Sequence, residues 1–138
     1  MSDRDEIIET VNRYCWAIDL KECGLLADVF TADIQADYDG LDWTDLDTMI
    51  ADMTASHDRL GGTQHLIGSH LVSLAGDEAT CRSYAHVVLT RRIDGQWAQY
   101  SMGARYTDQL RRVPGGWRVY QREARAMWRA GDRRVITD

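Results

Sequence analysis

The sequence predicts an α+β domain in which three N-terminal helices cover one face of a curved, mostly antiparallel sheet. In the first 60 residues, apolar side chains recur at the three- and four-residue steps of amphipathic helices. After residue 62, four long stretches rich in Val, Leu, Thr, Tyr and Trp are separated by short turn signals. At 138 residues the chain has the usual size of one domain with one continuous core. We therefore expect residues 1–138 to form a single domain.

The first helix has the clearest periodicity in the sequence. From Asp3 onward the apolar residues lie three or four positions apart, and Ser2 or Asp3 can cap the N-terminus. The apolar stripe consists of Ile7, Ile8, Val11, Tyr14, Cys15 and Ile18. We expect this face to be buried.

Two further helices are expected before residue 62. One covers Leu25–Phe30, and the extended stretch that follows, Ile34–Tyr38, predicts a first strand. The other begins at Asp45, and Gly61-Gly62 is expected to end it, because glycine commonly follows a helix C-terminus.

The remaining sequence predicts consecutive hairpins. The turn signals are Ala75-Gly76-Asp77, Asp94-Gly95 and Pro114-Gly115-Gly116. The expected strands are Thr63–Leu74, Ala79–Ile93, Trp97–Arg111 and Trp117–Trp128. Strands of this length usually bend, and glycines at positions 68 and 103 tolerate a bulge or a close backbone approach. A curved sheet of this kind encloses a cavity beneath the helices.

The charge balance argues against nucleic-acid binding. The chain has 16 Lys and Arg against 22 Asp and Glu, a net charge of −6, and Lys21 is its one lysine. Nucleic-acid-binding proteins instead gather basic residues into patches. No apolar run approaches membrane-spanning length, and the charged N-terminus lacks the apolar segment of a signal peptide. We expect no nucleic-acid or membrane partner and a cytoplasmic location.

The three cysteines do not form a recognisable framework. Cys15, Cys23 and Cys81 are scattered, with no CxxC pair and no histidine at metal-ligand spacing. The sequence therefore predicts reduced thiols, no metal site and no cofactor.

The segment Tyr14–Asp19 and His65 together suggest a general base made of Asp19 and His65. An ionised Asp19 can hold the His65 imidazole in one tautomer and stabilise the imidazolium that forms when His65 accepts a proton. Such a pair is a general base that needs neither metal nor cofactor. The alternative is a histidine that caps a helix end or bonds a backbone carbonyl.

Two more residues are candidates for catalysis. Tyr14 can donate a hydrogen bond to a carbonyl or phenolic oxygen as negative charge develops there, although it is otherwise an ordinary aromatic at the core edge. His86 shares one strand face with Tyr84 and Val88, and if that face looks into the cavity, His86 can protonate a leaving hydroxyl. A His86 on the outer face is the open alternative. His57 and His70 are expected to be structural or solvated.

Aromatic, methionine and arginine side chains can line an apolar pocket suited to a flat ring system. Core packing is the alternative for each apolar candidate. Arg122 can anchor a carboxylate or an enolate oxygen, and an exposed salt bridge is its alternative. The other candidates for substrate contact are Trp16, Tyr38, Trp43, Met53, Tyr100, Met102 and Trp128.

Several motifs along the chain resemble the SnoaL-like branch of the nuclear-transport-factor-2-like superfamily. The resemblance is carried by Tyr14–Asp19 followed by Leu26–Thr31, by Thr63–Gly68, by Gly103–Asp108 and by Gly116–Val119. It implies a cone-shaped fold, with helices packed against a strongly curved sheet.

The catalytic pattern resembles scytalone dehydratase and bile acid 7α-dehydratase. In those families a Tyr and an Asp on the first helix, a His at the start of a long strand, and a His or Asp on the next strand line the pocket. The matching positions here are Tyr14, Asp19, His65 and His86.

The resemblance and the residues together predict a cofactor-independent dehydratase, a lyase that acts on a small cyclic or aromatic hydroxy compound by His-Asp general acid/base catalysis. The alternatives are a ketosteroid-isomerase-like proton-shifting isomerase and a non-catalytic ligand-binding or accessory subunit. We expect a small apolar or aromatic substrate, and a homodimer or homotrimer formed through the open sheet face.

Overall fold

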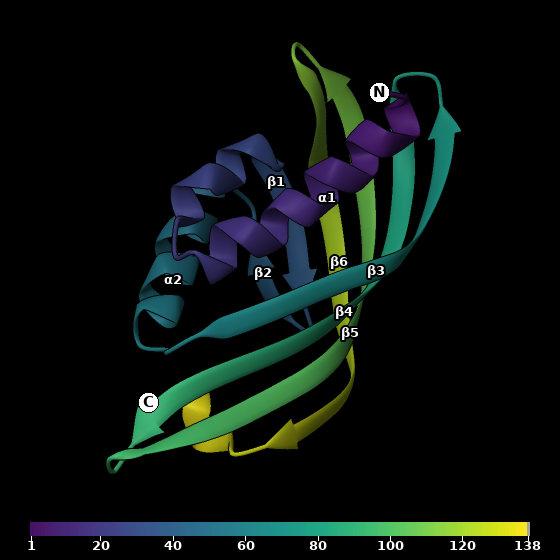
Figure 1. The fold of residues 1–138 in the computed structure, drawn as a ribbon. Coiled ribbons are helices and arrows are strands. Elements are labelled where there is room, and N and C mark those ends of the chain that lie inside the picture. The colour runs from purple at the N-terminus through teal and green to yellow at the C-terminus, as the bar shows by residue number, and fades with distance from the viewer. Residues whose placement is uncertain (138) are drawn as a thin grey trace.

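Helix α1 (Asp3–Asp19) lies across the concave side of a strongly curved sheet (Figure 1). The computed structural model describes residues 1–137 of the chain. The Ser2 hydroxyl caps α1 by accepting a hydrogen bond from the Asp5 N–H at 3.1 Å, as the sequence predicts. Ile7, Val11 and Ile18 are fully buried, so the predicted apolar stripe is the face that packs into the core.

Two shorter helices complete the helical layer, with boundaries that differ from the expected ones. The 3₁₀ helix η1 (Cys23–Asp28) begins earlier than predicted, and Phe30 already belongs to the first strand. Helix α2 (Leu46–Asp58) starts after Asp45, whose carboxylate accepts the Thr48 N–H at 2.8 Å. It ends three residues before Gly61, where a Cβ would overlap the Trp97 ring. Gly61 therefore allows a close approach between the loop and the sheet and does not cap the helix.

Six strands form one unclosed sheet in the order β2-β1-β6-β5-β4-β3. The pair β1–β6 is parallel and every other pair is antiparallel, as the mostly antiparallel prediction requires. The strands are β1 (Phe30–Tyr38), β2 (Leu41–Trp43), β3 (Thr63–Ala75), β4 (Glu78–Ile93), β5 (Gln96–Val113) and β6 (Gly116–Gly131). The four long strands match their predicted ranges closely, whereas the three-residue strand β2 was not predicted.

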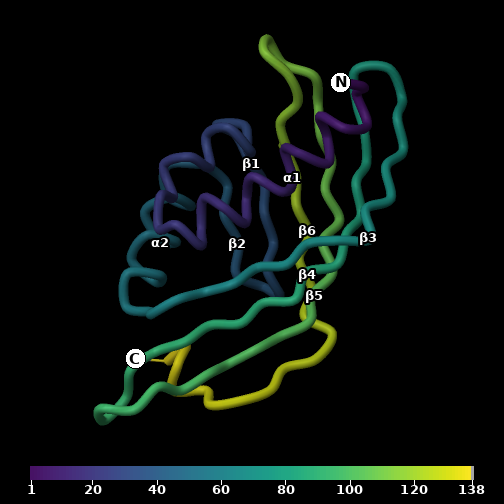
Figure 2. Tube along the Cα trace, viewed as in Figure 1, coloured from purple at the N-terminus to yellow at the C-terminus, as the bar shows by residue number. Residues whose placement is uncertain are grey.

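The long strands bend where the sequence places glycine. Figure 2 follows β4 and β5 as they curve beneath the helices. The β3–β4 register shifts between Gly68 and Leu71, where Ser69 has a φ of 55°, and the β5–β6 register shifts after Gly103. A Cβ at Gly103 would overlap the Trp128 indole, so this glycine lets the indole lie directly on the backbone.

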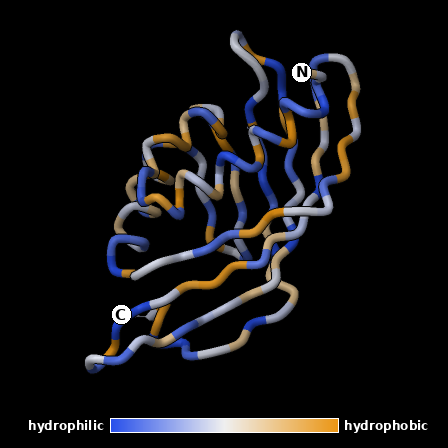
Figure 3. The backbone as a smooth tube through the Cα atoms, in the orientation of Figure 1, coloured by the Kyte–Doolittle hydropathy of each residue, from blue (hydrophilic) through white to orange (hydrophobic). Residues whose placement is uncertain are grey.

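Alternation along the strands separates an inner from an outer face. On β4, Cys81, Ala85 and Val87 are buried in the core shared with the helices, while Tyr84 and His86 between them are exposed. Figure 3 shows the same mixing of apolar and polar residues along the trace of α1 and the strands. The inner face and the helices enclose the core, and the outer face is uncovered by other parts of residues 1–137.

The chain after β6 turns back onto the sheet. The 3₁₀ helix η2 (Arg133–Val135) packs against β4 and β5, and Val135 is fully buried. None of the helices described over residues 1–137 has the length and apolarity needed to cross a membrane.

Candidate functional site

Asp19 and His65 meet where α1 ends and β3 begins. The His65 Nδ1 lies 2.7 Å from Asp19 Oδ1, and the His65 backbone N–H donates to Asp19 Oδ2 at 2.8 Å. The Thr63 hydroxyl donates to Oδ1, also at 2.8 Å. The carboxylate therefore joins two elements that are 46 residues apart in sequence.

These hydrogen bonds determine which groups carry protons. Burial raises the pKa of Asp19, but the hydrogen bonds from the His65 ring, the His65 backbone and the Thr63 hydroxyl together hold it below its usual value. An ionised carboxylate only accepts hydrogen bonds, so the His65 Nδ1 carries the ring proton in the neutral imidazole. The Nε2 atom then keeps a lone pair with which it can take a proton from a ligand.

His65 lines a cavity of about 650 Å³ beneath the helices. Most of its walls are apolar, which suits a small apolar or aromatic ligand. The structure brings Tyr14 and His65 to this cavity together with four of the predicted contact residues, Tyr38, Trp43, Met53 and Met102. Val87 and Leu89 from β4 and Tyr106 from β5 also line it.

Asp19 does not line this cavity itself and contacts His65, which does. Its carboxylate lines a second hollow of about 730 Å³, along α1 and the start of β3, which Trp16 and Thr63 also border. His65 lines both spaces. Tyr14 and Asp19 are five positions apart and point about 140° apart around an ideal helix. The His65 imidazole contacts both residues, since it is hydrogen-bonded to Asp19 and its ring centroid lies 5.9 Å from that of Tyr14.

A chain of hydrogen bonds ends at Tyr14. Arg122 donates through one guanidinium nitrogen to the Tyr38 hydroxyl at 3.2 Å, and the Tyr38 hydroxyl donates to the Tyr14 hydroxyl at 3.1 Å. Asp108 accepts two hydrogen bonds from Arg122, at 2.7 and 3.0 Å, and both side chains are fully buried. The guanidinium also lies 4.3 Å from the Tyr106 ring centroid and 4.4 Å from that of Tyr14.

This chain keeps Tyr14 protonated next to a positive charge. Burial raises the pKa of Tyr14 well above its usual value, Tyr38 and Tyr106 add to the rise, and Arg122 opposes it. Burial alone would lower the pKa of Arg122, but the Asp108 carboxylate outweighs it, so the guanidinium stays charged. Tyr14 thus offers a neutral O–H donor that a nearby cation polarises.

The expectation that His86 faces the cavity is wrong. His86 is on the exposed face of β4, because its neighbours Ala85 and Val87 take the buried positions of the alternating strand. Its ring lies 5.7 Å from the Trp128 ring, centroid to centroid, so Trp128 is also an outer-face residue.

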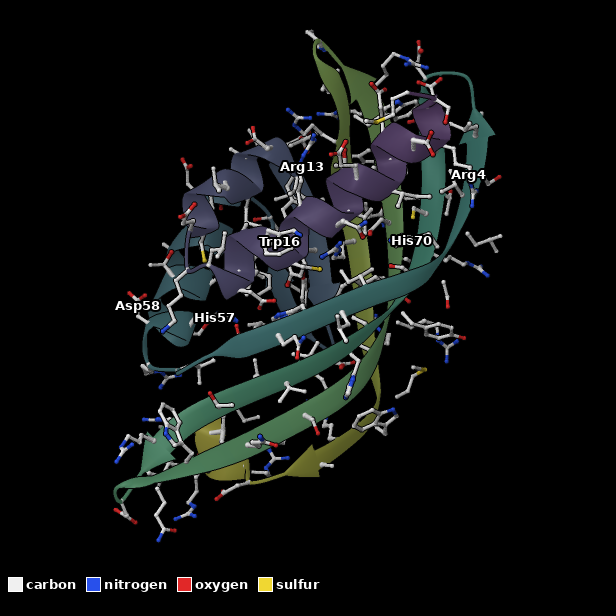
Figure 4. All side chains as sticks on the ribbon, in the orientation of Figure 1. Arg4, Arg13, Trp16, His57, Asp58 and His70 are labelled. Atoms are coloured by element: carbon white, nitrogen blue, oxygen red, sulfur yellow. The ribbon has the colours of Figure 1, made fainter. Side chains whose placement is uncertain are left out.

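Three other predicted contacts also lie away from the cavity. Trp16 is 65% exposed on the outer side of α1 and borders only the second hollow (Figure 4). Tyr100 is buried in the core without lining the cavity, and its hydroxyl has no hydrogen-bond partner among residues 1–137. Arg122 lies behind the tyrosines and supports them, so it does not line the cavity wall.

Sequence reasoning missed several residues that the fold brings to the site. His57 from α2 and Tyr106 from β5 line the cavity, and Asp108 anchors Arg122. A usable signal was present on β5, where Met102, Ala104, Tyr106 and Asp108 alternate with outward residues. The position of His57 depends on how α2 packs against η1, β1 and β2, which no local pattern reveals. Among residues 1–137, no cluster of three or more His, Cys, Asp or Glu side chains is arranged to hold a metal ion.

The structure is similar to several solved ones. A protein from Kribbella flavida is 28% identical with a TM-score of 0.86, over 93% of each chain. A proposed aromatic ring hydroxylase from Novosphingobium aromaticivorans is 22% identical with a TM-score of 0.86, over 98% of this chain and 96% of that one. A proposed scytalone dehydratase from the same organism is 21% identical with a TM-score of 0.81, over 94% and 87%. The last two likenesses establish the fold alone, because a shared fold hosts many activities.

No curated protein matches the chain. The family model of the SnoaL-like domain matches residues 1–123. These residues include α1, the Asp19–His65 pair, the cavity tyrosines and the Arg122–Asp108 pair. The resemblance inferred from the sequence motifs is therefore confirmed, and the chain belongs to the SnoaL-like domain family.

Proposed function

We propose that the chain is a cofactor-independent dehydratase that removes water from a small cyclic or aromatic hydroxy compound. The observation that carries the proposal is the Asp19–His65 pair, joined at 2.7 Å, with His65 at the wall of an apolar cavity. Two solved structures named as proposed dehydratases, one from Novosphingobium aromaticivorans and one from Streptomyces avermitilis, share the fold that holds this cavity.

His65 acts as the base. Its Nε2 takes a proton from a carbon next to a carbonyl or phenol, while Nδ1–H remains bonded to Asp19. The imidazolium that forms is stabilised by the adjacent carboxylate, as a general base requires. The electron pair of the broken C–H bond moves toward the substrate oxygen.

Tyr14 stabilises that oxygen. Tyr14 lines the cavity, and its hydroxyl belongs to the hydrogen-bond chain that starts at the charged Arg122. A donor aimed at developing negative charge in a water-poor site favours the transition state over the neutral ground state. The apolar walls supplied by Trp43, Met53 and Met102 would hold the ring of the substrate.

A proton-shifting isomerase is the nearest alternative. The same base can form an enolate, the same hydroxyl donor can stabilise it, and the proton is then returned to a different carbon. A non-catalytic binding or accessory protein is the other, since apolar walls alone bind a ligand. The three differ in product: loss of water, an isomer of equal mass, or no product.

The test is mass spectrometry of the chelator-treated protein with a panel of cyclic β-hydroxy ketones, hydroxylated naphthalenones and steroid-like alcohols. We expect loss of one water by the wild-type protein and by His86→Gln, and none by His65→Ala. His86→Gln is the matched control because His86 lies on the outer face of β4. Substrate retained unchanged by all three proteins would overturn the proposal in favour of a binding protein.

A further inference from the structure

His57 stands beside the base, at the end of α2 facing β3 (Figure 4). The centroids of the His57 and His65 rings are 6.4 Å apart, and the ring planes are tilted by 39°. Both rings line the cavity of about 650 Å³. One small substrate can therefore meet both imidazoles at once.

The helix fixes the orientation of the His57 ring. Its Nδ1 lies 2.9 Å from the Met53 carbonyl oxygen and 3.1 Å from the Ser56 hydroxyl. A carbonyl oxygen only accepts, so Nδ1 carries a proton in both charge states of the ring, and Nε2 is the nitrogen left to gain or lose one. The carbonyl end of a helix also favours a positive charge.

The surroundings of His57 differ from those of His65. No carboxylate accepts a hydrogen bond from the His57 ring among residues 1–137, whereas Asp19 accepts one from His65. Burial lowers the pKa of His57, the Met53 carbonyl and Asp19 oppose this, and His65 and Lys21 add to it. Asp52 on α2 lines the same cavity, and Asp58 and Arg59 follow His57 in sequence. A His57 imidazolium is accordingly a stronger acid than an ordinary one, and two imidazoles with different surroundings suit opposite proton-transfer roles.

His86 is on the outer face, so it cannot be the proton donor that the sequence predicted for the departing hydroxyl. Tyr14 and Tyr106 are poor proton donors, since burial raises the pKa of each. One oxygen of Asp52 already accepts the Trp43 indole N–H at 2.9 Å. His57 is the other imidazole that lines the cavity, beside His65.

We propose that His57 is the general acid that protonates the leaving hydroxyl, in the same cavity where His65 removes the carbon-bound proton. This inference rests on the proposed dehydration. His65 Nε2 gains the carbon-bound proton, and the C–H electron pair forms an enolate, whose oxygen Tyr14 stabilises, before it becomes the new carbon–carbon π bond. The C–O bond breaks with its electron pair on oxygen, and His57 Nε2–H supplies the proton that completes the water. Solvent then returns one proton to His57 and removes one from His65, so the cycle closes without an oxidant or reductant.

This assignment narrows the substrate class. The acidic C–H and the hydroxyl must lie on neighbouring carbons, as in a β-hydroxy ketone, so that one molecule reaches both rings. A substrate whose leaving group departs as a stable anion does not need the His57 proton.

The test compares a β-hydroxy ketone that the wild-type protein dehydrates with its acetate ester. In His57→Gln we expect the hydroxyl substrate to slow by about 10²-fold, a typical value for general acid catalysis, while acetate elimination stays within a few-fold of wild type. His65→Ala should lose both reactions. Asp58→Asn, a change in the next residue of α2, is the matched control and should lose neither.

Chemical rescue by added imidazole is a second measurement, which separates loss of the His57 proton donor from poor folding of a His57 variant. In His57→Ala, added imidazole should restore water loss and leave acetate elimination unaffected, because only the first reaction lacks a proton donor. Equal slowing of both substrates in His57→Gln, with no rescue by imidazole, would overturn the role of His57 while leaving the His65 base intact. Full activity of His65→Ala on both substrates would instead overturn the role of His65 as the base, and no water loss from any substrate by the wild-type protein would overturn the proposed dehydration itself.

Discussion

The Asp19 carboxylate accepts hydrogen bonds from both the ring and the backbone of His65, at 2.7 and 2.8 Å. The first bond orients the imidazole, and the second ties the start of β3 to the end of α1. A negative charge at a helix C-terminus is unfavourable on its own, and these donors offset it. The same residue therefore serves both the stability of the fold and the proposed chemistry.

Replacing Asp19 by Asn should remove a pH-dependent part of the stability. The pKa of Asp19 is lowered in the folded protein, so the unfolded chain takes up the proton first as the pH falls. The stabilisation is then present above the unfolded pKa and is lost as the pH falls through the folded one. Urea unfolding of both proteins should give a difference in unfolding free energy that is largest near neutral pH and shrinks below about pH 4. A difference that does not change with pH would mean that the carboxylate charge is not what stabilises this contact.

Tyr14→Phe should lower kcat far more than it raises KM, because the lost O–H acts on charge that develops in the transition state. Removal of one such donor typically costs about 10²–10³-fold in kcat. Steady-state kinetics on the identified substrate measures the split. Tyr100→Phe is the matched control, since Tyr100 lies outside the cavity and its hydroxyl has no partner among residues 1–137. Equal kinetics for both variants would contradict the role of Tyr14.

Asp108→Asn should strongly destabilise the fold, because it leaves the fully buried guanidinium of Arg122 without its compensating charge. Breaking one side of a buried pair typically costs about 3–5 kcal/mol, measurable by urea unfolding. Asp33→Asn removes the exposed partner of Arg111 and should barely move the unfolding midpoint. The double variant Asp108→Asn with Arg122→Met should regain part of the loss, and no regain would show that the buried charge is not the cause.

Trp128→Arg should weaken self-association. The outer face exposes Leu66, Tyr84 and Trp128, and the cross-strand register places Leu66 beside His86 and Gly103 beside Trp128. Light scattering of the wild-type protein should give two or three times the 15.7 kDa chain mass, and the variant should shift toward the monomer. A wild-type monomer would contradict the expected homo-oligomer.

The fold was predictable from sequence because its signals are local. The apolar stripe of α1, the cap at Asp45 and the turns between the long strands each depend on residues close in sequence. The strand β2 and the 3₁₀ form of η1 escaped prediction, since three residues carry no periodicity and a tight turn resembles the start of an α-helix.

The site was predictable only in part. The Asp19–His65 pairing was proposed from the chemistry of the two residues and supported by the family resemblance, and the structure places the two side chains in contact. Alternation alone did not give the face of His86, because it shows which residues share a face and not which face is inward. The apolar neighbours Ala85 and Val87 were the better signal, since they indicated that the opposite face is the buried one. His57 reaches the cavity because α2 packs against η1, β1 and β2, which are contacts that no local pattern reveals.

Hydrogen–deuterium exchange of the acidic C–H of a substrate ketone in D₂O, followed by NMR, shows whether His65 removes that proton. It isolates the proton abstraction assigned to His65 from every later step. We expect rapid exchange with the wild-type protein, slower exchange with Asp19→Asn and background exchange with His65→Ala. Exchange by His65→Ala at the wild-type rate would contradict the assignment of His65 as the base.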